Sequence, residues 1–343
     1  MVVSLLADLV AARSPSREEG PAADVIAAWC HGKGDILRAG HNVAMIRSGA
    51  PGPVLLVCSH HDTVPATASW TRPPWEPTID SGRMYGLGAN DAKGCVSAMA
   101  VACAAANVRR GTLIFAAVCE EEIGRGGLEA FLPLLSPLDT AIIGEPTGLE
   151  IAVAQNGMLI LDCVNRGRAG HAARPHLANN PIPAMARDIL AVDQLTLDRI
   201  HPAAGRTTHA VTLVHAGERH NVIPDEARWT IDLRTTASYT HAELAQIVAN
   251  LVQAEVIVRS ERFHPVQTPA GAAVLRAALK ARPSAKTFAS PTLSDWAHLG
   301  AIPAIKWGPG LSEVSHTADE WVELAMVEAA VDAYRATIEE LLS

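Results

Sequence analysis

Side chains able to bind a metal ion follow a short apolar segment near the start of the chain. The run Val54–Cys58 is aliphatic and leads, after one residue, into His60-His61-Asp62. A continuous apolar run of this length predicts a strand that is buried on both faces. Ligands of open α/β sheets bind beyond the carboxyl ends of strands, where His60 could bind a metal and Asp62 could orient it. Taken alone, the pair does not distinguish a metal ligand from a loop histidine beside a turn.

The same pattern recurs at three later apolar runs and at one glycine-rich turn. Each delivers an acidic residue or a histidine: Thr112–Cys119 precedes Glu120, Glu121 and Glu122; Ala141–Gly144 precedes Glu145; Ile302–Trp307 is followed by His316; and the turn Gly86–Gly94 contains Asp91. Adjacent carboxylates repel one another unless a cation or a shared proton is present. Two histidines with several carboxylates are a suitable ligand set for a pair of divalent ions such as Zn²⁺.

The elements that must position these residues alternate between strand and helix up to residue 157. Small apolar residues fill Cys95–Ala106, which predicts a buried helix. Gly94 stands at its start, so the positive end of this helix points toward Asp91. The alternation predicts an α/β fold with a parallel or mixed sheet.

The pattern changes after Asn156-Gly157. From there a strand, a helix, two strands, a helix and a strand follow, an order that resembles a ferredoxin-like unit. We therefore predict two domains: a discontinuous, metal-binding catalytic α/β domain at residues 1–157 and 266–343, and an inserted α+β lid domain at 158–265.

Composition excludes several classes of function. The chain has 343 residues, 49% of them hydrophobic, and a formal net charge of −8 with no basic run. These properties argue against binding to nucleic acid or to an anionic membrane. The six cysteines form no C-x-x-C pair, which suits reduced thiols in a cytoplasm. The apolar segment Val2–Ala12 contains Asp8 and follows no basic residues, so it predicts a first helix and not a signal peptide.

Taken in order, these motifs resemble those of the M20 family of metallopeptidases and amidohydrolases, and the resemblance covers nearly the whole chain. The family implies a catalytic α/β domain and a smaller lid that often forms the interface of a homodimer. The matching segments are His60-x-Asp62-Thr-Val-Pro, Gly88-x-x-Asp91-x-Lys-Gly94, Glu121-Glu122-x-Gly, Gly144-Glu145-Pro-Thr, Gly170-His171-Ala, Asn221-Val-Ile-Pro and His316.

The resemblance implies a site for two divalent ions, with zinc as the first choice and cobalt as an alternative. His60 and Glu145 would bind one ion, and Glu122 and His316 the other. Asp91 would bridge the two. In the family the peptide bond after this bridging residue is usually cis, which here is Asp91-Ala92.

The resemblance also implies catalytic roles. Glu121 would be the general base, with Asp62 as its neighbour through His60. His171 would come from the lid, often that of the partner subunit, and stabilise the oxyanion. Lid contacts to a substrate carbonyl or carboxylate would come from Asn221 and Arg234.

One departure from the family pattern affects the glutamates. The family usually has Asp before its Glu pair, where this chain has Glu120, so the register of base and ligand is ambiguous. The following Ile123-Gly124 matches the family only if Glu121 is the base.

The implied activity is zinc-dependent hydrolysis of a linear amide in a small N-acyl amino acid. Two stretches, Gly167–Ala172 and Gly308–Glu320, look most like deacetylases of N-acetylornithine and N-acetylcitrulline, which places arginine biosynthesis first. An N-succinyl-diaminopimelate desuccinylase and a di- or carboxypeptidase are the alternatives. A non-catalytic protein that binds amino acids or metal on the same fold would be expected to lack the base, and Glu121 is present.

Overall fold

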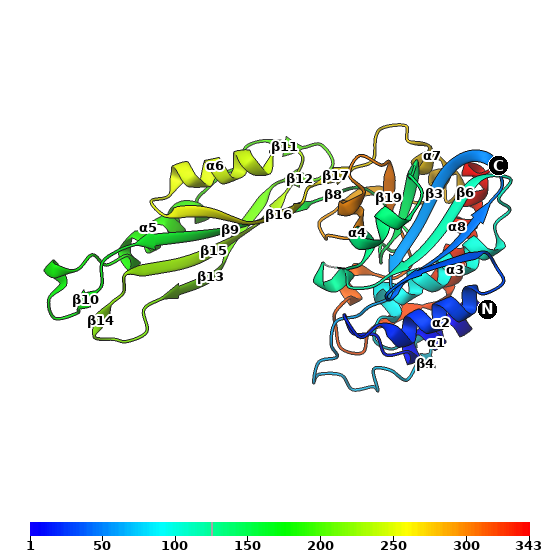
Figure 1. Cartoon of the computed structure of the whole chain (residues 1–343), viewed down its shortest axis with the longest axis horizontal. Helices are drawn as coiled ribbons and strands as arrows, with labels where there is room; N and C mark the ends of the chain where they lie inside the picture. Colours follow the sequence, from blue (N-terminus) through cyan, green and yellow to red (C-terminus); the bar gives the residue numbers. More distant parts are fainter. Residues whose placement is uncertain (125) are drawn as a thin grey trace. The chain divides into compact units, whose positions relative to one another are not determined.

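The computed structural model describes residues 1–124 and 126–343 and divides into two compact units. Unit 1 contains Met1–Val153, Gln267–Phe288 and Ser294–Ser343, and unit 2 contains Ala154–Val266 and Ala289–Leu293. The limits predicted from the sequence, 157/158 and 265/266, lie close to these. Figure 1 shows the course of the chain through both units.

A mixed sheet forms the centre of unit 1. Among the described residues its order is β1-β2-β6-β3-β7-β19-β8-β17, with β18 paired to β8. The strands β6, β3, β7 and β19 run parallel to one another, and β1, β2 and β8 are antiparallel to their neighbours. The bounds are Asp35–Ala39 (β1), Asn42–Ser48 (β2), Ala50–His60 (β3), Arg110–Val118 (β6), Thr140–Gly144 (β7), Ile151–Gln155 (β8), Val266–Gln267 (β17), Thr287–Ser290 (β18) and Ala304–Lys306 (β19).

Helices cover one face of this sheet because alternate residues of its strands are apolar and buried. Val57, Ile142 and Ile305 belong to one core with residues of α1, α3 and α8. The helices of unit 1 are Val2–Ala11 (α1), Gly20–Cys30 (α2), Gly94–Ala105 (α3), Leu128–Phe131 (α4), Ala273–Ala281 (α7) and Leu324–Leu341 (α8).

The opposite face of the sheet carries Cys58 on β3 and Lys306 on β19, which share a row with Ile143 of β7. A short helical segment, η5 (Asp295–Leu299), contacts both β19 and α4. Its first residue, Asp295, interacts electrostatically with Cys58. The sheet is therefore buried on both faces, as the continuous apolar runs predict.

A small antiparallel sheet completes unit 1. Its order is β20-β5-β4, from Trp321–Glu323 (β20), Arg83–Tyr85 (β5) and Thr78–Asp80 (β4). The sequence predicts a helix from Val322 to Leu342, but Val322 and Glu323 pair with β5, so the helix begins at Leu324. The sequence also predicts a helix from Gly126 to Leu135, but α4 has only one turn and is followed by the 3₁₀ turn Leu132–Leu134 (η3).

Unit 2 has the strand order β13-β15-β9-β16, with helices α5 and α6 on one face (Figure 1). In chain order this is the strand and helix succession of a ferredoxin-like unit, as predicted. Trp229 and Leu161 of the sheet pack with Leu244 of α6, while Asp162 and Thr230 lie on the other face. The bounds are Gly157–Arg166 (β9), Ile182–Asp193 (α5), Thr208–Ala216 (β13), Glu226–Thr235 (β15), His241–Leu251 (α6) and Glu255–Phe263 (β16), with short strands Gly170–His171 (β10), Ile200–His201 (β11), Gly205–Arg206 (β12) and Val222–Ile223 (β14).

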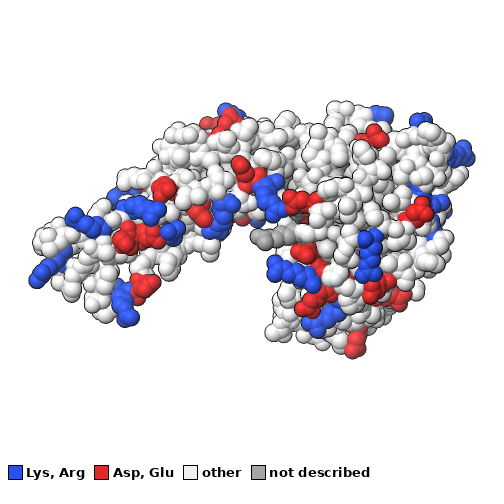
Figure 2. Space-filling model, in the orientation of Figure 1, with Lys and Arg blue, Asp and Glu red and all other residues white. Residues whose placement is uncertain are grey.

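Helix hydropathy and the distribution of surface charge complete the description of the fold. Among the residues that the structure describes, no helix is both long and apolar enough to cross a membrane. On the face drawn in Figure 2, basic side chains are interspersed with acidic ones and form no continuous basic patch.

Candidate metal centre

Three parallel strands end at the same edge of the sheet and deliver the first polar side chains of the site. His60 is the last residue of β3 and is in register with Val118, the last residue of β6. Ser59 is in register with Gly144, which ends β7 and precedes Glu145. The glutamates after β6 and Glu145 therefore reach the same edge as His60.

His60 lies close to one oxygen of Asp91 and near Glu145. The His60 Nε2 atom lies 3.1 Å from Asp91 Oδ1 and 4.0 Å from Glu145 Oε1. All three side chains are largely buried. Asp91 is positioned by the loop after β5, where the peptide bond Asp91-Ala92 is cis, as the resemblance predicts.

A second pair, Glu122 and His316, lies near the other oxygen of Asp91, and ligand atoms of His60, Asp91 and Glu122 lie within 4.8 Å of one another. His316 Nε2 lies 2.9 Å from Glu122 Oε1 and 3.8 Å from Asp91 Oδ2. The two oxygens of Asp91 thus face different histidines, which is the geometry that a bridging ligand requires. The side chain of His316 is 52% exposed, so this end of the cluster opens to solvent.

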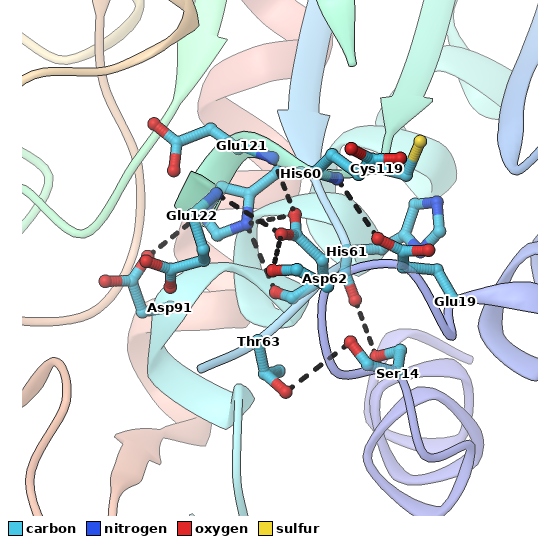
Figure 3. Close-up of polar contacts among 12 residues, drawn as sticks. Ser14, Glu19, His60, His61, Asp62, Thr63, Asp91, Cys119, Glu121 and Glu122 are labelled. Atoms are coloured by element: carbon cyan, nitrogen blue, oxygen red, sulfur yellow. Dashed lines mark hydrogen bonds and ion pairs between the residues drawn. The ribbon is translucent and has the colours of Figure 1, made fainter. Parts of the chain in front are cut away.

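Asp62 holds the other groups in place through both of its oxygens (Figure 3). Its Oδ1 lies 3.3 Å from His60 Nδ1 and accepts a hydrogen bond from the backbone N–H of Glu121. Its Oδ2 accepts from the N–H of Glu122 and from the hydroxyl of Ser16. The contact with His60 matches the sequence-based expectation, whereas nothing in the sequence pointed to Ser16 or to the backbone contacts.

The three consecutive glutamates occupy different environments. Glu120 has a left-handed backbone (φ 53°), and its carboxyl group lies beside Gly126. Glu122 reaches His316. Burial raises the pKa of Glu121 well above its usual range; Glu145, Asp295 and Glu122 add to the increase and His60 opposes it. A carboxyl group with a raised pKa in a cluster of this kind is suited to carrying a proton.

The electrostatics of the cluster fit divalent cations. Burial raises the pKa of Glu145 to about 8, with Asp91 and Asp295 contributing and Lys306 opposing. The hydrogen bond to Glu122 raises the pKa of His316 to about 9. Two ligands of a tetrahedral zinc ion lie roughly 3.4 Å apart, close to the separations between the histidines and the carboxylates here. The donor set and its crowded negative charge therefore fit two metal ions.

Two further charged residues beside the cluster were missed by the sequence analysis. Asp295 is 4% exposed and Lys306 is 2% exposed. Burial raises the pKa of Asp295 to about 7, and burial lowers the pKa of Lys306, although Glu145, Glu121 and Asp91 oppose that decrease. Neither residue belongs to a motif with metal-ligand spacing. The strand register of β19 reveals Lys306, and the packing of η5 against β19 reveals Asp295.

The three predicted lid residues all lie in unit 2 and do not form one group. His171 of β10 pairs with Val222 of β14, and the carbonyl oxygen of Asn221 accepts a hydrogen bond from Ala172. Both His171 and Asn221 are exposed. Arg234 lies near the other end of the unit, at the close of β15, where its guanidinium binds Asp232.

Comparison with known proteins establishes the class. The chain belongs to peptidase family M20/M25/M40, whose family model matches residues 56–340. It is a metal-dependent hydrolase of amide bonds. Its relatives include a succinyl-diaminopimelate desuccinylase of Xanthomonas oryzae pv. oryzae, 30% identical with 99% of both chains covered. Another is a putative LysW-lysine/LysW-ornithine hydrolase of Pyrobaculum aerophilum, 30% identical with 88% of this chain and 86% of the relative covered.

Solved structures share the fold. The aminopeptidase PepT of Bacillus cereus matches with a TM-score of 0.80 at 19% identity, covering 100% of this chain and 98% of the other. The YxeP protein of Bacillus subtilis, described as a dinuclear metal-binding peptidase of the M20 family, matches with a TM-score of 0.76 at 20% identity, covering 99% and 97%. Both confirm the predicted mixed α/β fold and are consistent with a two-domain architecture.

Proposed function

We propose that this chain hydrolyses the amide bond between an acyl group and the amino group of an amino acid, using two divalent metal ions, zinc first. The observation that supports this proposal is that His60 and His316 lie near different oxygens of Asp91, with Glu145 near His60 and Glu122 beside His316. His60 and Glu145 would hold one ion, Glu122 and His316 the other, and Asp91 both. When bound, the ions would polarise the amide carbonyl group and make a water molecule more acidic.

Proton transfer is assigned to Glu121. Its carboxylate accepts the proton of the attacking water molecule and then donates it to the nitrogen of the leaving amine. Asp62 keeps this glutamate in place by accepting its backbone N–H. The raised pKa of Glu121 supports the second half of the cycle, because the carboxyl group must hold the proton until the amine leaves.

For the acyl group, the relatives favour succinyl over acetyl. The sequence placed N-acetylornithine and N-acetylcitrulline first and the desuccinylase second. The desuccinylase relatives span nearly the whole chain, so N-succinyl-diaminopimelate becomes the first candidate substrate. A LysW-linked lysine or ornithine is the second, because the Pyrobaculum relative is described as a putative LysW-lysine/LysW-ornithine hydrolase. Asn221 and Arg234 would contact the carbonyl and carboxylate groups of the substrate.

A homodimer through unit 2 would complete the site. His171 lies beyond the start of β15, whereas Arg234 lies near its end. Glu226 and Arg234 are eight residue steps apart along the strand, which is roughly 26 Å, more than a small N-acyl amino acid spans. A substrate that contacts both residues therefore takes them from two subunits. Strand β13 is available for pairing because it is an edge strand that exposes Leu213 and Val214.

A substrate panel tests the proposed chemistry. Zinc-loaded protein is incubated with N-succinyl-diaminopimelate, N-acetylornithine, N-acetylcitrulline and simple dipeptides, and the released amine is measured. We expect the highest kcat/KM for the succinyl compound and loss of turnover after removal of metal by a chelator. Turnover of dipeptides alone would contradict the acyl-amino-acid proposal, and metal-independent turnover would contradict the role of the cluster. The six buried, unpaired cysteines suit a reducing cytoplasm.

A further inference from the structure

A further buried carboxylate, Glu320, lies beside the candidate metal centre and has no role in the mechanism above. Glu320 is only 2% exposed. Its Oε1 accepts hydrogen bonds from the backbone N–H groups of Asn90 (2.8 Å) and Asp91 (2.9 Å). Its Oε2 accepts from the N–H of Gly88 (2.9 Å). One carboxylate thus satisfies three backbone donors of the loop that carries the proposed bridging ligand.

This loop cannot satisfy those donors by itself. Gly88 has a left-handed backbone (φ +80°), and Asp91 and Ala92 are not helical. Buried N–H groups without a partner cost free energy, so the loop keeps this conformation only where an acceptor is supplied from elsewhere. Glu320 supplies it from a segment 229 residues further along the chain.

Asn90 connects the same loop to the segment that carries His316. Its side-chain amide donates to the carbonyl oxygen of Leu311 and to the hydroxyl of Ser315, and its Oδ1 accepts from the N–H of Leu311. Glu320 and Asn90 therefore join the loop of Asp91 to both ends of the segment around His316. These contacts lie within unit 1.

A buried cation accompanies the carboxylate. Lys93 is fully buried, interacts electrostatically with Glu320 and Asp62, and donates to the carbonyl oxygen of Ala12. Asp62 holds the loop of Glu121 and Glu122 in the same way that Glu320 holds the loop of Asp91. Lys93 thus lies near two carboxyl groups that each fix a ligand-bearing loop.

We propose that Glu320 is a positioning residue that holds Asp91, and through Asn90 the His316 segment, in metal-binding geometry before any ion binds. This role rests on the proposed two-metal function. Glu320 acts through backbone N–H groups, and its carboxylate oxygens are already occupied by them, so it is not a further metal ligand.

The test is zinc affinity measured by calorimetry on the intact chain, for the wild type and for Glu320→Gln. Glutamine keeps the shape and the Oε1 acceptor but presents an NH₂ group to the N–H of Gly88. We expect the affinity for zinc to fall about 10–100-fold, as is typical when a group that orients a metal ligand is lost. Asp188→Asn is the matched control: Asp188 is 3% exposed and accepts the N–H groups of Gln253 and Ala254 in unit 2. The control should lower the melting temperature and leave zinc affinity unchanged.

Unchanged zinc affinity in folded Glu320→Gln would overturn the proposal. If this variant does not fold, hydrogen exchange of metal-free wild type decides instead, because the amides of Gly88, Asn90 and Asp91 should be strongly protected. Exchange at the rate of an open loop would overturn the role of Glu320. Absence of zinc binding by the wild type would instead contradict the proposed function, and the exchange experiment would still test the hydrogen bonds.

Discussion

At the scale of single residues, the chemistry depends on which of three consecutive glutamates does what. Glu120 lies against Gly126, Glu121 interacts with His60 and Glu145, and Glu122 pairs with His316. Asp62 fixes the backbone of the last two. These environments favour Glu121 as the proton carrier and Glu122 as a metal ligand.

The first prediction separates those two roles. Glu121→Gln should keep its metal and lose turnover by about 10²–10⁴-fold, because the proton acceptor is lost while the ligands remain. Glu122→Gln should bind less metal, because a carboxylate ligand becomes a neutral amide. Metal content by mass spectrometry and kcat on an N-acyl amino acid are the measurements.

Glu120→Gln is the control for both variants and should change neither quantity by more than a few-fold. Should Glu121→Gln lose metal while Glu122→Gln keeps it, the assignment of base and ligand would be shifted by one residue.

The sequence predicts a residue of the site wherever a polar side chain stands at the end of an apolar run. His60 ends one buried strand, and Glu121 and Glu145 follow two others, so strand polarity brings them to one edge. Lys306 could not be found in this way. It interrupts an apolar strand and would be read as solvent-facing, but the carboxylates beside it allow it to be buried.

At the scale of elements, the start of α6 in unit 2 contains a histidine that should make stability depend on pH. His241 is 3% exposed, its Nε2 lies 2.9 Å from Thr235 Oγ1, and its ring stacks on His264. Burial lowers the pKa of His241 below its usual 6.5, and His264 adds to this decrease. The positive end of the helix also disfavours a charged ring.

The prediction concerns the stability of unit 2 between pH 7.5 and 5. A lowered pKa means that the unfolded chain binds the proton first, so the contribution of His241 is complete above pH 6.5 and is lost as pH falls toward the folded-state pKa. Each unit of pKa difference corresponds to about 1.4 kcal/mol. Hydrogen exchange of the β9 amides in the intact protein should therefore show reduced protection in acid.

His241→Gln should flatten this dependence, because glutamine does not titrate in this range. His220→Gln, at an exposed position, is the control and should leave the dependence unchanged. Equal acid sensitivity in His241→Gln and the wild type would contradict the role of His241.

Elements were predictable where periodicity and burial agree. The ferredoxin-like order of unit 2 could be predicted from the succession of strands and helices along the sequence. The strand conformation of Val322 and Glu323 could not be predicted, because their sequence pattern is helical and pairing with β5 overrides it. Strand β8 was also missed. This five-residue strand lies directly before the change in sequence pattern at residue 156, which obscures it as a separate element.

At the scale of the whole molecule, the distribution of His171 and Arg234 within unit 2 favours a site shared between subunits. Mixing His171→Ala with Glu121→Gln tests this. Each variant alone should be nearly inactive, and in a mixed dimer one site would combine Glu121 of one subunit with His171 of the other. Random exchange at equal amounts should restore about one quarter of wild-type activity.

Subunit exchange is verified separately with differently labelled chains. Proven exchange without recovery would mean that each chain supplies its own His171 or that His171 has no part in the reaction. The sequence could not predict this feature from any residue pattern, because subunit contacts depend on surfaces that strand and helix periodicity do not define.

The central claim, that five side chains from separate loops bind two metal ions, is tested most directly by anomalous diffraction from a zinc-loaded crystal at the zinc absorption edge. We predict two peaks, one beside His60 and Glu145 and one beside Glu122 and His316, with an oxygen of Asp91 bound to each. Zinc bound elsewhere, or a fully occupied site that leaves Asp91 without a metal contact, would contradict it.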